Sequence, residues 1–136
     1  MALLPSSDRA LAHLGLRWVL GLNITLHGAV RLPNLAGFVA AVKPGFEGTW
    51  LPTAVAGAYL WVLPFLELAV GLALIAGFRL RWTLFAGMML MGTLTAGTCL
   101  KQDWSNAGIQ LLYTLVYWVL LRYSADAEPD SKQAAG

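Results

Sequence analysis

YLWVLPFLELAVGLALIAG, residues 59–77, carries a single carboxylate, Glu67, in the middle of an otherwise apolar run. It belongs to the segment 53–78, which as a helix is long enough to cross a hydrocarbon core of about 30 Å. An ionisable side chain at that depth costs at least about 2.5 kcal/mol, so it normally has a partner or faces water. Pro64 interrupts the helical hydrogen bonds just before Glu67, and Gly71 lets a second helix come close. We therefore expect the other segments to pack around this carboxylate.

The composition of the chain is that of a membrane protein. Of its 136 residues, 58% are hydrophobic and 12% are charged, and the mean hydropathy is +0.65. Soluble domains carry charge on about a quarter of their residues. The formal net charge of +2 is too small to favour nucleic acid as a partner. A single cysteine, Cys99, excludes an internal disulfide, a CxxC redox pair and an iron–sulfur cluster held by this chain alone.

The apolar runs predict an all-α, integral membrane four-helix bundle that occupies residues 1–124. Its four spans are expected at residues 11–30, 53–78, 82–100 and 104–121. Because only residues 79–81 separate the second span from the third, these two are expected to be antiparallel. The connection at residues 31–52 is rich in proline and glycine but contains the apolar run LAGFVAAV, which predicts an interfacial or re-entrant outer loop. Residues 125–136 are polar and are predicted to form a disordered cytoplasmic tail.

Arginine and lysine are unevenly divided between the two ends of the predicted bundle. The end with both termini and the turn at residues 79–81 would carry six of them, and the opposite end would carry three. Cytoplasmic segments of membrane proteins are enriched in these two residue types. Both termini are therefore expected in the cytoplasm. Arg31, Arg79 and Arg81 are interpreted as anchors at the membrane boundary.

Polar side chains of different spans fall at similar depths. From the helical rise, Glu67, Gln110 and Asn23 lie roughly 16–18 Å from the cytoplasmic ends of their spans. By the same count His27 lies higher, at roughly 24–27 Å, and Arg17 lower, at roughly 9 Å. The fourth span adds further polar residues on the face of Gln110. We predict one polar seam inside the bundle, formed by Arg17, Asn23, His27, Glu67, Asn106, Gln110, Tyr113 and Tyr117.

The polar seam has a functional and a structural interpretation. In the first, Glu67 accepts a proton beside a quinone, His27 is a proton donor, and the amide and phenol groups bind the quinone carbonyls. In the second, Glu67 pairs with Arg17 or Gln110, His27 bonds a loop carbonyl, and the seam only joins helices. No metal site is predicted, because His13 and His27 lie about 21 Å apart on one helix and cannot both reach one haem iron.

The order of these features resembles the DoxX family of small four-span bacterial membrane proteins. The resemblance covers residues 16–121 and includes the stretch QDWSNAGIQLLYTLVYWVLL at the fourth span. It implies a four-helix bundle in the bacterial inner membrane. It also implies roles in redox metabolism, since some members are linked to sulfur-compound oxidation with quinone as acceptor and others to oxidative-stress complexes. The single residues that carry it are Arg17, Gly21, His27, Gly28, Arg31, Phe38, Pro52, Glu67, Gly71, Leu74, Gly77 and Arg81.

Three functional classes follow from the sequence. The first expectation is an accessory or assembly subunit of a larger respiratory or redox complex in the inner membrane. The alternative is a quinone-linked oxidoreductase subunit that acts on a sulfur compound, and a second alternative is a small-molecule or proton carrier. The expected partners are the lipid bilayer and other membrane subunits or a second copy of the chain, and the possible cofactor is a quinone. Whether the chain is itself an enzyme stays open.

Overall fold

A computed structural model describes residues 7–124, and all the regular structure within that range is helical. Four long helices dominate: α1 (Asp8–Ala29), α3 (Thr53–Ala76), α4 (Leu80–Leu100) and α5 (Trp104–Arg122). The all-α prediction is confirmed, and the expected span boundaries agree with these helices to within three residues. Ser7 is the N-cap of α1, where its side chain accepts a hydrogen bond from the backbone N–H of Ala10. The tail predicted at residues 125–136 lies outside the described residues.

The connection between α1 and α3 is more regular than expected. It contains the 3-10 helix η1 (Leu32–Asn34), the short helix α2 (Leu35–Val42) and the 3-10 helix η2 (Lys43–Phe46). Asn34 caps α2, since its side chain accepts the backbone N–H of Gly37 at 3.1 Å. The apolar run that was predicted as an interfacial or re-entrant loop is therefore a capped helix, and it packs against α3.

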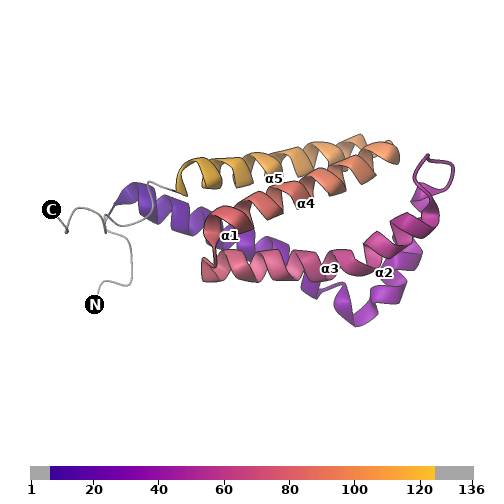
Figure 1. The fold of residues 1–136 in the computed structure, drawn as a ribbon, viewed down its shortest axis with the longest axis horizontal. Helices are drawn as coiled ribbons and strands as arrows, with labels where there is room; N and C mark the ends of the chain where they lie inside the picture. Colours follow the sequence, from indigo (N-terminus) through magenta and orange to yellow (C-terminus); the bar gives the residue numbers. More distant parts are fainter. Residues whose placement is uncertain (1–6, 125–136) are drawn as a thin grey trace.

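The four long helices form two tight pairs, α1 with α3 and α4 with α5. In Figure 1, α4 and α5 run side by side, with α1 and α3 on the other side and α2 at the far end from the termini. A three-residue turn joins α3 to α4, and Gly77 ends α3 in the left-handed conformation at φ 70°. The N-terminus of α1, the C-terminus of α5 and this turn lie at one end of the molecule, which we call the base.

Glycines bring α1 and α3 into backbone contact. A Cβ added to Gly28 would lie 2.4 Å from the carbonyl oxygen of Pro64, and one added to Gly71 would lie 2.5 Å from the backbone nitrogen of Thr25. Real Cβ atoms do not approach backbone atoms this closely. The predicted role of Gly71 in close packing is therefore confirmed, and Gly21 and Gly28 play the same role on α1.

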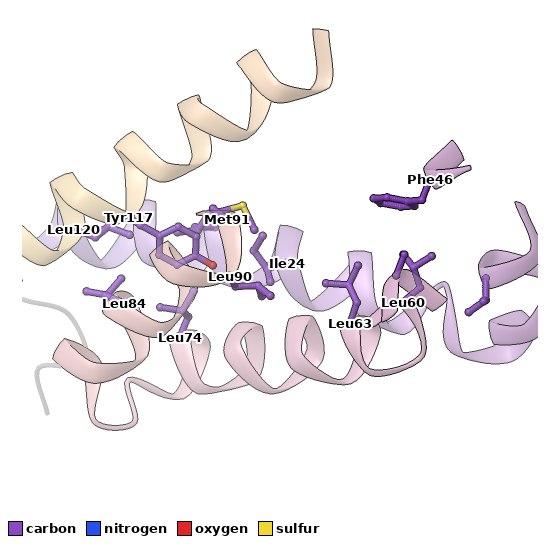
Figure 2. Packing of buried hydrophobic residues seen from close by; sticks show 13 residues of the cluster. Ile24, Phe46, Leu60, Leu63, Leu74, Leu84, Leu90, Met91, Tyr117 and Leu120 are labelled. Carbon is purple, nitrogen blue, oxygen red and sulfur yellow. The ribbon is translucent and has the colours of Figure 1, made fainter. Parts of the chain in front are cut away.

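The two pairs join at the base through a buried aromatic contact. Tyr117 of α5 is fully buried. Its ring lies against Gly87 of α4 within its own pair, and it belongs to the same core cluster as Leu74 of α3 in the other pair. Figure 2 shows Tyr117 close to Leu74, Leu84 and Leu120, with Phe46 and Leu60 lying well apart toward the other end. His13 adds a polar link, since its Nε2–H donates to the carbonyl of Leu120 at 2.9 Å.

The outer surface of all four long helices is apolar. Two of them, α3 and α4, are both long and hydrophobic enough to cross a membrane. Helices α1 and α5, with 22 and 19 residues, have lengths of about 33 Å and 28 Å but carry more polar side chains. Large exposed hydrophobic side chains are found on each helix, among them Trp18, Val19, Leu22 and Leu26 on α1, Trp61, Val62 and Phe65 on α3, Phe85 and Met89 on α4, and Leu111, Leu112, Leu115 and Trp118 on α5.

The contact between α1 and α3 predicts opposite effects of adding one methyl group at two helical glycines. Gly28→Ala should destabilise the protein by about 1–3 kcal/mol, because the new Cβ meets backbone rather than a movable side chain. Gly92→Ala should leave stability unchanged or raise it, because nothing lies within 4 Å and alanine favours a helix. Thermal unfolding in the same detergent compares the two. Equal melting temperatures would contradict the tight crossing.

Candidate functional site

A cavity of about 680 Å³ lies between the two helix pairs, in the half of the molecule away from the base. Its walls come from the second half of α1 and α4, the first half of α3 and α5, and the segment from α2 to residue 51. Apolar side chains make up most of the wall, including Ile24, Val42, Phe46, Leu60, Leu63, Met91 and Leu94. The cavity therefore lies beyond the packed base, where Tyr117 lies in the core between the two pairs.

The carboxylate of Glu67 pairs with Arg31 inside this cavity. The Nη1–H of Arg31 donates to Oε2 of Glu67 at 2.5 Å. The Glu67 side chain is 3% exposed, whereas that of Arg31 is 26% exposed. The structural interpretation of the seam paired Glu67 with Arg17 or Gln110, and that pairing is wrong, because the partner is Arg31, which the sequence analysis had interpreted as an anchor. The ion pair is therefore an internal feature of the bundle.

The register of the contact between α1 and α3 explains why Arg31 is the partner of Glu67. Gly28 lies against Pro64 and Leu68, so Arg31, three residues further along the chain, reaches the level just above Glu67. The sequence analysis gave Arg31 an anchoring role because it lies at the end of the first span, and an arginine side chain is long enough to reach back into the bundle from there. The register could have been found from the glycines, since the closest approach of two helices sets which residues face each other.

Six of the eight polar seam residues line the same cavity: Asn23, His27, Glu67, Asn106, Gln110 and Tyr113. Asn23 and His27 contribute from α1, one turn apart as their spacing predicts. The structure therefore brings the seam residues of three helices together. Their chemical roles stay predictions.

On the α4–α5 side, two polar seam residues are held by neighbours. Gln110 accepts a hydrogen bond at its Oε1 from the hydroxyl of Thr98 at 2.8 Å. Asn106 donates to Asp103, from its side chain at 2.6 Å and from its backbone at 3.2 Å. These two bonds lower the pKa of Asp103, which is the N-cap of α5. Asn106 is therefore partly engaged in capping its own helix.

Arg17 and Tyr117 do not belong to the cavity wall. The Arg17 guanidinium lies against Gly77, so its charge sits at the C-terminal end of α3, where a cation is favoured by the helix dipole. Tyr117 lies in the core beside Gly87. The prediction that Arg17 faces a ligand with the other seam residues is wrong. Its position next to the turn gives it a structural role in holding α1 to the end of α3.

The wall between α3 and α4 is closed by a hydrogen bond. Tyr59 and Thr93 are joined through their hydroxyls at 2.6 Å, and both residues line the cavity. The hydroxyl of Thr93 also donates to the Leu90 carbonyl at 2.8 Å, which makes Tyr59 the donor in the bond between them. This bond connects the two helix pairs above the base.

The arrangement can bind and orient a small molecule. Among residues 7–124, no group of three His, Cys, Asp or Glu side chains comes together, and Cys99 is a free, partly buried thiol. The groups that face the cavity are hydrogen-bond donors and acceptors beside an apolar wall. Such a site recognises a ligand with a polar head and a hydrophobic body.

Comparison with protein-family models, with curated proteins and with solved structures finds no match to this chain. The resemblance to the DoxX family therefore stays an expectation from the sequence.

The ion pair predicts an asymmetric effect of removing its two partners. Arg31→Met should destabilise the protein by about 3 kcal/mol, because it leaves the Glu67 carboxylate buried without a partner. Glu67→Met leaves only the more exposed Arg31 unpaired and should cost less. The double variant should be more stable than Arg31→Met alone, because no unpaired charge remains. Thermal unfolding of the four proteins measures the cycle, and additive effects of the two changes would show that the pair contributes nothing.

Proposed function

We propose that this protein is a four-span membrane protein whose internal cavity binds a membrane-dissolved, amphipathic molecule of the quinone class. The observation that carries the proposal is the cavity of about 680 Å³, apolar over most of its wall and polar around Arg31 and Glu67. Ligand cavities of roughly 300–1,000 Å³ with a few polar groups are typical of small-molecule sites.

The membrane setting is supported by the distribution of polarity. Large apolar side chains face outward on all four long helices, whereas Glu67, Thr98 and His13 are buried. This pattern is typical of a protein in the hydrocarbon core of a membrane, because polar groups there must find their hydrogen-bond partners inside the protein. Trp50 and Trp104 are exposed near one end, and Trp82 and Tyr123 near the base, as expected of aromatic residues at the two headgroup regions.

Both the polar carbonyl groups of a quinone and its apolar ring and tail match the residues that line the cavity. Its carbonyl groups accept hydrogen bonds, and the polar residues of the wall include the donors Arg31, Asn23 and Gln110. Its ring and tail are apolar, as is most of the wall. The resemblance to the DoxX family points the same way, since some members use quinone as an electron acceptor. The chain's own residues would bind and orient the quinone, and the electrons would come from a substrate or a partner protein.

The accessory-subunit hypothesis remains compatible with this proposal. A small bundle that binds quinone can serve as a subunit of a larger respiratory complex in the bacterial inner membrane. The carrier hypothesis differs, because it requires a flux of solute or protons across the membrane. Vesicles with the purified protein that show no such flux but retain quinone binding would separate binding from transport.

Filling the cavity should prevent binding. Leu94 lines the cavity, so Leu94→Trp should lower the affinity for a benzoquinone with a decyl tail at least tenfold. Leu112→Trp places the same side chain on the exposed face of α5 and should leave the affinity unchanged. Scintillation proximity with the tritiated quinone and protein in lipid nanodiscs measures both. Unchanged affinity in a folded Leu94→Trp protein would refute the cavity as the site.

The orientation can be tested with single cysteines in a Cys99→Ala background. Trp50 is 80% exposed in the loop after η2, and Phe78 is exposed in the turn at the base. In intact inner-membrane spheroplasts, Trp50→Cys should react with a membrane-impermeant maleimide, whereas Phe78→Cys should react only after lysis. The reverse pattern would place the termini outside, and labelling of both before lysis would argue against a spanning bundle.

A further inference from the structure

We propose that Arg31 is the residue that recognises the ligand, by donating hydrogen bonds to acceptor atoms on a neutral head group, and that Glu67 and Phe38 hold it in position. This inference rests on the proposed function, which assigns a class of ligand to the cavity but not the side chain that selects it. The sequence interpretation gave Arg31 only an anchoring role.

Arg31 has donors left over after pairing with Glu67. A guanidinium carries five N–H groups, and one of these bonds the carboxylate. The remaining N–H groups have no acceptor among residues 7–124, although the side chain is only 26% exposed. Arg31 lines the cavity, so its accessible edge is available to a molecule inside it. The residue therefore offers unused hydrogen bonds where the wall is otherwise mostly apolar.

The guanidinium is fixed from two directions. Its carbon lies 4.8 Å from the centre of the Phe38 ring, which is also part of the cavity wall. Arginine stacks on aromatic faces while its planar edge stays free to donate. Glu67 binds one end of the guanidinium edge. Helix α1 ends at Ala29, so its C-terminal carbonyl groups lie close to Arg31 and stabilise its positive charge. Arg31 is thus pre-organised before any ligand binds.

The opposite charges of Arg31 and Glu67 favour a ligand whose hydrogen-bond acceptor is uncharged. Glu67 neutralises Arg31, so an anionic head would meet the carboxylate as well as the guanidinium. A ring carbonyl accepts the hydrogen bonds without adding a charge. Lys101 is the other cation on the wall within the described residues, and its ammonium lies 5.4 Å from the centre of the Phe46 ring, on the turn between α4 and α5. Arg31 is therefore the cation next to the carboxylate, and Lys101 serves as its control.

Two probes of equal shape isolate the role of Arg31. Decyl benzoquinone carries two carbonyl acceptors, and decyl p-xylene replaces each carbonyl oxygen by a methyl group. The unchanged protein in nanodiscs should bind the quinone at least tenfold more tightly than the xylene, as expected of a hydrogen bond from a charged donor. Arg31→Lys keeps a cation beside Glu67 but loses the planar fork, and should remove most of this preference without weakening xylene binding.

Matched variants separate recognition from folding. Phe38→Leu keeps an apolar side chain in place of the ring that orients Arg31, and should reduce the preference for quinone several-fold. Lys101→Met should leave the preference unchanged. An unaltered preference in Arg31→Lys would overturn the inference, and so would an equal loss of affinity for both probes, which indicates a structural role only. Failure of the unchanged protein to bind either probe would overturn the proposed function and this inference with it, whereas equal binding of both would overturn the inference alone.

Discussion

A carboxylate enclosed by apolar helices has to be paired, and in this protein the partner of Glu67 is Arg31. The pair joins the middle of α3 to Arg31, two residues beyond the end of α1, at the level set by the contact of Gly28 with Pro64. It also determines where the next segment goes, because the Phe38 ring of α2 lies against the same guanidinium. One polar contact thus fixes the end of α1, the position of α2 and the polar part of the cavity.

The remainder of the cavity follows from how the two helix pairs meet. Tyr117 of α5 packs beside Leu74 of α3 (Figure 2), and His13 bonds the carbonyl of Leu120, so the pairs are closed at the base. Above the base they are connected by Tyr59 and Thr93, with Phe46 of η2 lying against Lys101 on the other pair. The space between these contacts, which is partly open to the surroundings, is what a ligand would occupy. Arg17 strengthens the base by lying against the turn at Gly77.

Much of this arrangement could be predicted from the sequence. The helices follow from apolar runs bounded by Ser7, Gly77 and Asp103, each of which ends or caps a helix in the structure. The depth count brought Asn23, Glu67 and Gln110 to one level, and all three line the cavity. The sequence did not show that Arg31 reaches inward to Glu67, because its place at the end of a span is typical of a boundary anchor. Arg17 lies low in the bundle, as the count indicates, but its guanidinium lies against the end of α3 and not beside Glu67. The helical character of residues 35–42 was missed because flanking prolines and glycines indicated a loop.

We propose that a membrane-dissolved molecule occupies the cavity in the cell. The most direct measurement is extraction of the protein from its native membrane into polymer nanodiscs without detergent, followed by mass spectrometry of everything that remains bound. We expect a quinone in roughly equimolar amount, lost in the Leu94→Trp protein and retained in the Leu112→Trp protein. A chain that carries only bulk lipids, or partner subunits at fixed stoichiometry with no such molecule, would contradict it and would make the polar seam a packing feature of a structural subunit.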